Sequence, residues 1–212
     1  MVDRQIIWDW NGTLLNDIDA ALAAANQMLA SRDLPTLTLD RYREIFGFPV
    51  RGFYRLAGFR LETEDWDAMA CEFHRIFLSQ PTMRLFDDTI PALEHFQKSG
   101  YRQVMLSASK QELLTGIIGQ FKLTPYFDAV KGIDTLYGTS KIELGKELLR
   151  QSPIPPERTV MIGDTLHDAE VAAALGTSCI LVARGHQSLG RLQTTGVPLA
   201  ANLSELRVLL GE

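Results

Sequence analysis

Two acidic side chains follow apolar runs of the sequence, where the ends of buried strands would place them in one site. Asp9 follows the run IIW, and Asp164 follows the run VMIG. Carboxylates gathered in one site repel one another unless a cation joins them, and oxygen ligands in a site open to substrate suit Mg²⁺. An aspartate held beside Mg²⁺ is also a known type of nucleophile that forms an aspartyl-phosphate. These residue types therefore point to phosphoryl chemistry.

Three further residues extend this candidate site. Asp168 lies four residues after Asp164, so the two share a face if a helix begins near residue 165. One of them could bind the metal directly and the other through water. Ser107, which ends another apolar run, and Lys141 could hold the phosphoryl oxygens. The main-chain amides of the turn from Trp10 to Thr13 could add donors.

Each residue alone also has an ordinary structural explanation. An aspartate at the end of a strand often closes a turn, and Ser107 could cap the helix that follows it. Lys141 could be a solvated residue in the first turn of a helix. The order and placement of all of them together favour a site.

The elements that must position these residues alternate along the chain. Apolar runs predict strands over 4–9, 101–109, 127–133, 158–164 and 178–183, and helices over 89–98, 110–121, 140–151, 166–176 and 203–210. This alternation predicts an α/β fold with a doubly wound parallel sheet. Because parallel strands end at the same edge, Asp9, Ser107 and Asp164 should meet there.

A helical insertion interrupts the α/β pattern after the first strand. Residues 17–31, 39–46, 50–58 and 63–79 show helical spacing, and no strand is predicted from 17 to 84. We therefore divide the chain into a core domain, 1–16 and 85–212, and a helical cap domain, 17–84. An insertion at this point lies over the carboxyl ends of the strands and is a candidate lid.

The composition is that of an ordinary globular protein. The net charge of −5 argues against nucleic acid as a partner, because phosphate-backbone binding requires a basic face. The two cysteines are far apart and indicate a reducing compartment, and no segment has the length of a membrane span. We expect a cytoplasmic protein that does not bind membranes, a monomer or homodimer, acting on a small phosphorylated metabolite.

With these motifs in order, the chain resembles haloacid dehalogenase (HAD) superfamily hydrolases of the phosphoglycolate phosphatase-like branch. The family's four motifs are matched by DWNGT at 9–13, Ser107, Lys141 and GDTLHD at 163–168. The resemblance covers essentially the whole chain and implies a Rossmann-like core with a small helical cap. It implies Asp9 as the nucleophile of a phosphatase.

The resemblance also implies the ligands of the metal. Mg²⁺ would be held by Asp9, Asp164 and the main-chain carbonyl of Asn11, with Asp168 as a supporting acid near the metal and Lys141. From the placement of the residues, we expect the substrate to contact Trp10, Gly12, Thr13, Ser107, Ala108 and Lys141.

Asn11 is the one departure from the family pattern. Phosphatases of the family carry an aspartate here, which protonates the leaving oxygen and later activates water. An amide has no proton to give near neutral pH. General acid–base help is typically worth ~10²–10⁴-fold. We therefore expect a phosphatase with weakened turnover. The alternative is a catalytically impaired HAD-like protein with a phosphate-binding or regulatory role.

Other reactions of the superfamily fit the sequence less well. The phosphonate-cleaving branch needs a lysine in the cap, and residues 1–97 contain none. The dehalogenases work without Mg²⁺ and do not need the acidic fourth motif. The sugar-phosphate mutases keep the second aspartate. Hydrolysis of a phosphomonoester is the leading hypothesis.

The cap is expected to set specificity. The stretch FGFPVRGFYRLAGFR at 46–60 mixes five aromatic residues with Arg51, Arg55 and Arg60. Arg51 is our candidate for contacting a substrate anion. Alternatively, the stretch is a small helical core with solvated arginines. Trp10 is expected to face the cap, and His186 could reach the edge of the site.

Overall fold

The protein is described by a computed structural model that covers residues 3–137 and 141–212. Its centre is a six-stranded parallel sheet with the order β5-β4-β1-β6-β7-β8. The strands are β1 (Arg4–Trp8), β4 (Tyr101–Lys110), β5 (Ala129–Ile133), β6 (Thr159–Gly163), β7 (Ser178–Val182) and β8 (Leu199–Ala200). The predicted α/β fold with a parallel sheet is confirmed.

Helices cover both faces of the sheet, which is why its strands are apolar almost throughout. Along β1, Ile6 and Trp8 face one apolar core and Ile7 faces the other, as alternation in a strand requires. The first core is covered by α5 (Thr89–Lys98), α6 (Gln111–Gln120) and α10 (Leu206–Leu209). The second is covered by α7 (Ile142–Arg150), α8 (Leu166–Leu175) and α9 (Leu189–Gln193).

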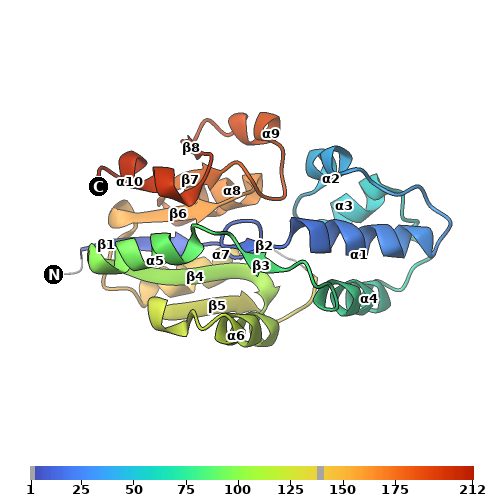
Figure 1. The fold of residues 1–212 in the computed structure, drawn as a ribbon, viewed down its shortest axis with the longest axis horizontal. Coiled ribbons are helices and arrows are strands. Elements are labelled where there is room, and N and C mark those ends of the chain that lie inside the picture. The colour runs from blue at the N-terminus through green and yellow to red at the C-terminus, as the bar shows by residue number, and fades with distance from the viewer. Residues whose placement is uncertain (1–2, 138–140) are drawn as a thin grey trace.

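The insertion after β1 consists of α1 (Ile18–Ala30), α2 (Leu39–Ile45), α3 (Val50–Ala57) and α4 (Trp66–Leu78), called the cap below. The cap has an apolar core of its own, in which α1 contributes a stripe of alanines with Met28 and Leu29. Figure 1 shows the cap beyond the carboxyl ends of the strands, at the opposite end of the molecule from the C-terminus. The predicted helical insertion is confirmed.

Two short strands lie where the chain enters and leaves the cap. β2 (Leu15–Asn16) and β3 (Arg84–Leu85) pair antiparallel. The sequence did not predict them, because strands of two residues show no alternation. The expectation that 17–84 holds no strand is wrong at its last residue, where β3 begins. The domain boundaries themselves stay a prediction.

The remaining differences concern short elements near the C-terminus. α9 and β8 were not predicted, and the helix expected over 203–210 is a 3₁₀ turn (Leu203–Glu205) followed by α10. Two more 3₁₀ turns, Thr124–Tyr126 and Pro156–Arg158, precede β5 and β6. Among the helices of the described ranges, none has the length and apolarity needed to cross a bilayer.

Candidate active site

Asp9 lies at the middle of the sheet edge, because β1 runs between β4 and β6. Asp9 directly follows β1, Ser107 lies near the end of β4, and Asp164 directly follows β6. All three line one cavity between the sheet and the cap. The structure therefore brings together the residues that the sequence places at three strand ends.

Lys141 joins this group from the position just before α7. Its buried ammonium group binds Asp9 Oδ1, pairs with Asp168 Oδ1 at 2.8 Å and donates to the carbonyl of Leu106 at 3.0 Å. Burial alone would lower the pKa of Lys141, but the carboxylates of Asp168 and Asp9 outweigh it and raise the pKa. Lys141 is therefore charged at neutral pH and fixes the side chain of Asp9.

Asp9, Asp164 and Asp168 form a buried cluster in which each residue offers one carboxylate oxygen, and these three oxygens lie within 4.8 Å of one another. Burial raises the pKa of Asp9 and of Asp164, and Lys141 and His186 respectively offset only part of the rise. Lys141 and His186 thus compensate the three carboxylates only in part. Oxygen ligands of this kind could bind Mg²⁺.

Asp168 is held more firmly by the protein than its two partners. Its Oδ2 accepts hydrogen bonds from the hydroxyl of Thr165 at 2.7 Å and from the amides of Thr165 and Asp164 at 3.0 and 3.2 Å. Burial would raise the pKa of Asp168, but Lys141 and Thr165 outweigh it and lower the pKa. These contacts fit the supporting role that the resemblance implies for Asp168, which stays a prediction.

Two glycines make room for the carboxylate of Asp164. A Cβ at Gly12 would lie 2.2 Å from Asp164 Oδ2, and a Cβ at Gly185 would lie 2.0 Å from the same atom. Gly12 also has a φ of +71°, which side chains disfavour. The carboxylate of Asp164 therefore rests directly against two stretches of backbone.

The remaining predicted residues around Asp9 have defined positions. The hydroxyl of Thr13 lies 3.4 Å from Asp9 Oδ2 and from Asp164 Oδ1. The amide of Gly12 already donates to Asp17 Oδ1 at 2.9 Å, and that of Thr13 to the carbonyl of Trp10 at 3.3 Å. Trp10 and Ala108 line the cavity. Of the turn amides predicted as donors, those of Gly12 and Thr13 are thus engaged within the protein.

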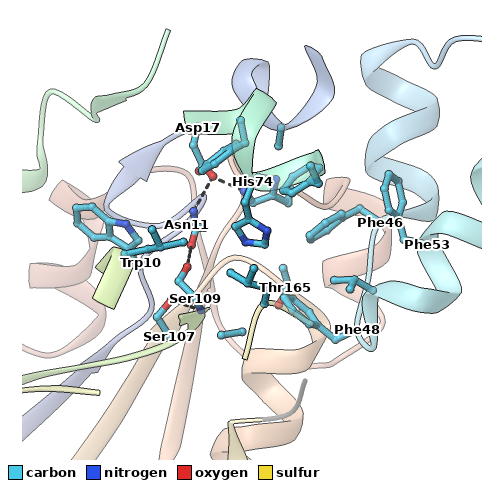
Figure 2. Close-up of a pocket in the computed structure, with 18 of the residues that line it drawn as sticks. Trp10, Asn11, Asp17, Phe46, Phe48, Phe53, His74, Ser107, Ser109 and Thr165 are labelled. Atoms are coloured by element: carbon cyan, nitrogen blue, oxygen red, sulfur yellow. Dashed lines mark hydrogen bonds and ion pairs between the residues drawn. The ribbon is translucent and has the colours of Figure 1, made fainter. Parts of the chain in front are cut away.

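Asn11 has a specific hydrogen-bond partner on each side of its amide. Its Nδ2 donates to Asp17 Oδ2 at 2.7 Å, and its Oδ1 accepts from the hydroxyl of Ser109 at 2.7 Å. Figure 2 shows Asn11 between these two residues. The site is thus built around an amide at this position, with a carboxylate facing its donor side.

His186 links Asp17 to the cap. Its Nε2 lies 3.2 Å from Asp17 Oδ1, its Nδ1 lies 2.9 Å from the hydroxyl of Tyr42 in α2, and its main-chain amide donates to Asp164 Oδ2 at 2.6 Å. Burial alone would lower the pKa of His186, but its contact with Asp17 outweighs this and raises the pKa to about 9. The sequence indicated that His186 could reach the site but missed Asp17, Ser109 and Tyr42.

The cavity continues from Asp9 into the cap, and Figure 2 shows its wall of aromatic side chains. His74 of α4 also lines the cavity, which the sequence did not indicate.

Arg51 does not line the cavity. It is exposed, with its guanidinium 5.5 Å from the centre of the Trp66 ring. Arg55 and Arg60 are exposed as well. The arginines of this stretch are solvated, as the alternative interpretation had it.

Replacing Lys141 should destabilise the protein strongly in the absence of metal. Lys141→Met would leave three buried carboxylates without their cation, and breaking a buried ion pair costs roughly 3–5 kcal/mol. Urea unfolding would measure this loss, and added Mg²⁺ should recover part of it. Lys146→Met, which changes an exposed lysine of α7, is the matched control. Equal losses in the two variants would contradict the assigned role of Lys141.

Known proteins are similar to this chain over most of its length. A family model described as haloacid dehalogenase-like hydrolase matches residues 6–182. Phosphoglycolate phosphatase of Caulobacter vibrioides is 28% identical over 85% of this chain and 79% of its own. Tyrosine-protein kinase PtkA of Mycobacterium tuberculosis is 27% identical over 97% of this chain and 72% of its own.

Solved structures extend the likeness to the fold. The structure of PtkA superimposes with a TM-score of 0.82 at 26% identity, over 100% of this chain and 99% of that one. The crystal structure of a predicted phosphatase from Clostridium acetobutylicum has the same fold, with a TM-score of 0.82 at 19% identity over 99% of each chain.

Proposed function

Because this chain belongs to the haloacid dehalogenase-like hydrolase family, we propose that it is an Mg²⁺-dependent phosphatase acting on a small phosphomonoester. One observation carries the proposal. The carboxylate of Asp9 lies at the carboxyl-terminal edge of the sheet and contacts Lys141. It belongs to the acidic cluster that could hold the metal. A structural aspartate at the end of a strand would not need a buried lysine and two further carboxylates.

The proposed reaction has two steps. Asp9 attacks the phosphorus atom, the bond from phosphorus to the ester oxygen breaks, and that oxygen leaves with the electron pair. Water then attacks the phosphorus of the aspartyl-phosphate, the bond to Asp9 breaks, and inorganic phosphate is released.

Each neighbouring residue has a part in this scheme. Lys141 keeps the nucleophile in place, and Lys141 and the hydroxyl of Ser107 hold the phosphoryl oxygens. Bound Mg²⁺ would be held by Asp9, Asp164 and the main-chain carbonyl of Asn11 and would supply positive charge to the phosphoryl group. Asn11 offers the leaving oxygen no acidic proton, so the first step depends on how stable the leaving group is without one.

Removing the metal tests this proposal. Phosphate release from a panel of phosphomonoesters should stop in EDTA and return with excess Mg²⁺. Mg²⁺ should also raise the melting temperature, since a ligand at a hundred times its Kd adds about 2.7 kcal/mol to the free energy of unfolding. Asp164→Asn should lose both responses. Hydrolysis that continues unchanged in EDTA would contradict the proposal.

The alternative is an impaired phosphate-binding or regulatory protein, and Asn11 favours it. Curated relatives of this chain include a protein named as a tyrosine kinase as well as phosphatases, so the family likeness alone does not select hydrolysis. The two functions differ in one result. Binding of inorganic phosphate with Mg²⁺, without turnover of any ester in the panel, would support the alternative.

A further inference from the structure

We propose that the site takes phosphate esters of uncharged aromatic alcohols, and phenols above all. This inference rests on the phosphatase function proposed above and names its substrate class. Two independent features carry it, namely the walls of the cavity beyond Asp9 and the amide at position 11.

The cavity that holds the phosphoryl site also reaches the cap. Its volume is about 150 Å³, and its lining includes Asp9 and Lys141 as well as residues of the cap helices. An apolar cavity of about 150 Å³ accommodates a single benzene ring, so an ester with one ring is the largest aromatic substrate that this size suits. The phosphoryl group of an aryl phosphate would lie at Asp9 while its ring lay in the cap.

The wall beyond the phosphoryl site is aromatic and aliphatic. Residues from all four cap helices and their connections contribute, together with α6 of the core, and Figure 2 shows three of the phenylalanines around one space. Phe46, Phe48, Phe53, Trp66, Phe73 and Ile117 belong to this wall. Burying a ring against such side chains is favourable, and ring–ring contacts add about 0.5–1.5 kcal/mol.

The same wall offers no cation to a second anionic group on the substrate. Among the described residues that line the cavity, the only lysine or arginine is Lys141, which is already paired with Asp9 and Asp168. His186 is paired with Asp17. A carboxylate carried into the cap, as on phosphoglycolate, would lose its hydration without gaining a partner, which is costly.

His74 does not supply that charge. Its Nδ1 lies 2.8 Å from the carbonyl of Ala70, and a carbonyl can only accept, so the proton is on Nδ1. Burial lowers the pKa of His74, which keeps the ring neutral at pH 7. Figure 2 shows the ring pointing into the space between Asn11 and the phenylalanines. Its free Nε2 is an acceptor and suits a hydroxyl or N–H group on the substrate.

The absence of an acid at Asn11 also favours esters of phenols over esters of alkyl alcohols. Without a proton donor, the ester oxygen must leave as an anion. Phenols lose their proton near pH 10, whereas alkoxides are about as basic as hydroxide, the conjugate base of water with a pKa of about 15.7. A phenol therefore leaves without help far more readily than an alcohol does. Aliphatic acyl phosphates such as acetyl phosphate also have good leaving groups, but they lack a ring for the cap.

Phosphonates that cannot be hydrolysed test the recognition of the ring apart from turnover. With Mg²⁺ present, benzylphosphonate should bind at least about tenfold more tightly than 3-phosphonopropionate by calorimetry, from burial of the ring. Equal affinities, tighter binding of 3-phosphonopropionate, or failure of both to bind would overturn the substrate class.

A charge introduced in the wall provides a second, structural test. Val50 lines the cavity at the start of α3, whereas Leu56 on the same helix is 59% exposed and lies outside it. Val50→Arg should lower the preference for benzylphosphonate at least about tenfold by giving the carboxylate a partner. Leu56→Arg should leave the preference unchanged. The same change in both variants, or in neither, would argue against the assigned cavity.

Turnover separates this inference from the phosphatase proposal itself. Phenyl phosphate should be hydrolysed with a higher kcat/KM than acetyl phosphate or phosphoglycolate. A preference for either of the latter two would overturn the substrate class and leave the phosphatase function standing. Selective binding of benzylphosphonate with no hydrolysis of any ester would support the substrate class and overturn the phosphatase function.

Discussion

Asp9→Asn should abolish phosphate release while leaving the protein folded. Removing the residue that forms the covalent intermediate lowers turnover on the order of 10⁶-fold in a serine protease. Phosphate release from phenyl phosphate with Mg²⁺ is the measurement, and unchanged hydrolysis would refute the nucleophile assignment.

The stability of the same variant gives an independent check. Asp9→Asn removes one of three buried carboxylates that repel one another, while Lys141 keeps Asp168 and the carbonyl of Leu106 as partners. Urea unfolding without metal should therefore show no loss of stability, and the stabilisation by Mg²⁺ should shrink. A collapse of the metal-free protein would mean that the lost activity reports unfolding and not chemistry.

Restoring an acid at position 11 should raise activity, provided that Asp17 changes with it. Asn11→Asp alone would place two carboxylates at the distance of the present hydrogen bond, 2.7 Å, where they must share a proton or repel each other. The double variant Asn11→Asp with Asp17→Asn reverses the pair and keeps one amide donating to one carboxylate. General acid–base help in that variant is expected to be worth ~10²–10⁴-fold.

The gain should depend on the leaving group. Benzyl phosphate and phenyl phosphate both carry a ring, but only benzyl phosphate has a leaving oxygen that needs a proton. The double variant should therefore gain much more on benzyl phosphate. Asp17→Asn alone is the control and should gain on neither substrate. Equal gains on both would contradict the argument, and intact mass should first exclude deamidation of the Asn11–Gly12 pair.

The part of the site carried by the sheet could be predicted from the sequence. Asp9 and Asp164 follow apolar runs of ordinary strand length, and a parallel sheet places such residues at one edge whatever the details of the loops. Lys141 precedes a periodic helix, and its position followed from the same reasoning. At this edge of the sheet the residue types were informative, because carboxylates and a lysine are seldom buried for packing alone.

The part carried by the cap could not be predicted. His74 and Phe73 lie on a helix whose spacing shows which face is apolar but not whether that face meets a core or a cavity. Arg51 was chosen for its charge, yet its position on α3 turns it to solvent over Trp66. Asp17 precedes α1 and looked like an ordinary helix-start residue, and its contact with Asn11 depends on the turn between them. Such contacts arise from tertiary packing and leave no periodicity in the sequence.

The loop after β7 connects the cap to the acidic cluster. Arg43 of α2 donates to the carbonyls of Gly185 and Arg184 at 3.0 and 3.2 Å, and Gln187 donates to the carbonyl of Phe46 at 2.8 Å. Between these cap contacts, the amide of His186 holds Asp164. One short segment thus contacts both the cap and Asp164, the proposed metal ligand. If the cation binds more tightly when the cap is closed over a substrate, thermodynamic reciprocity requires the substrate to bind more tightly, by the same factor, when the cation is present.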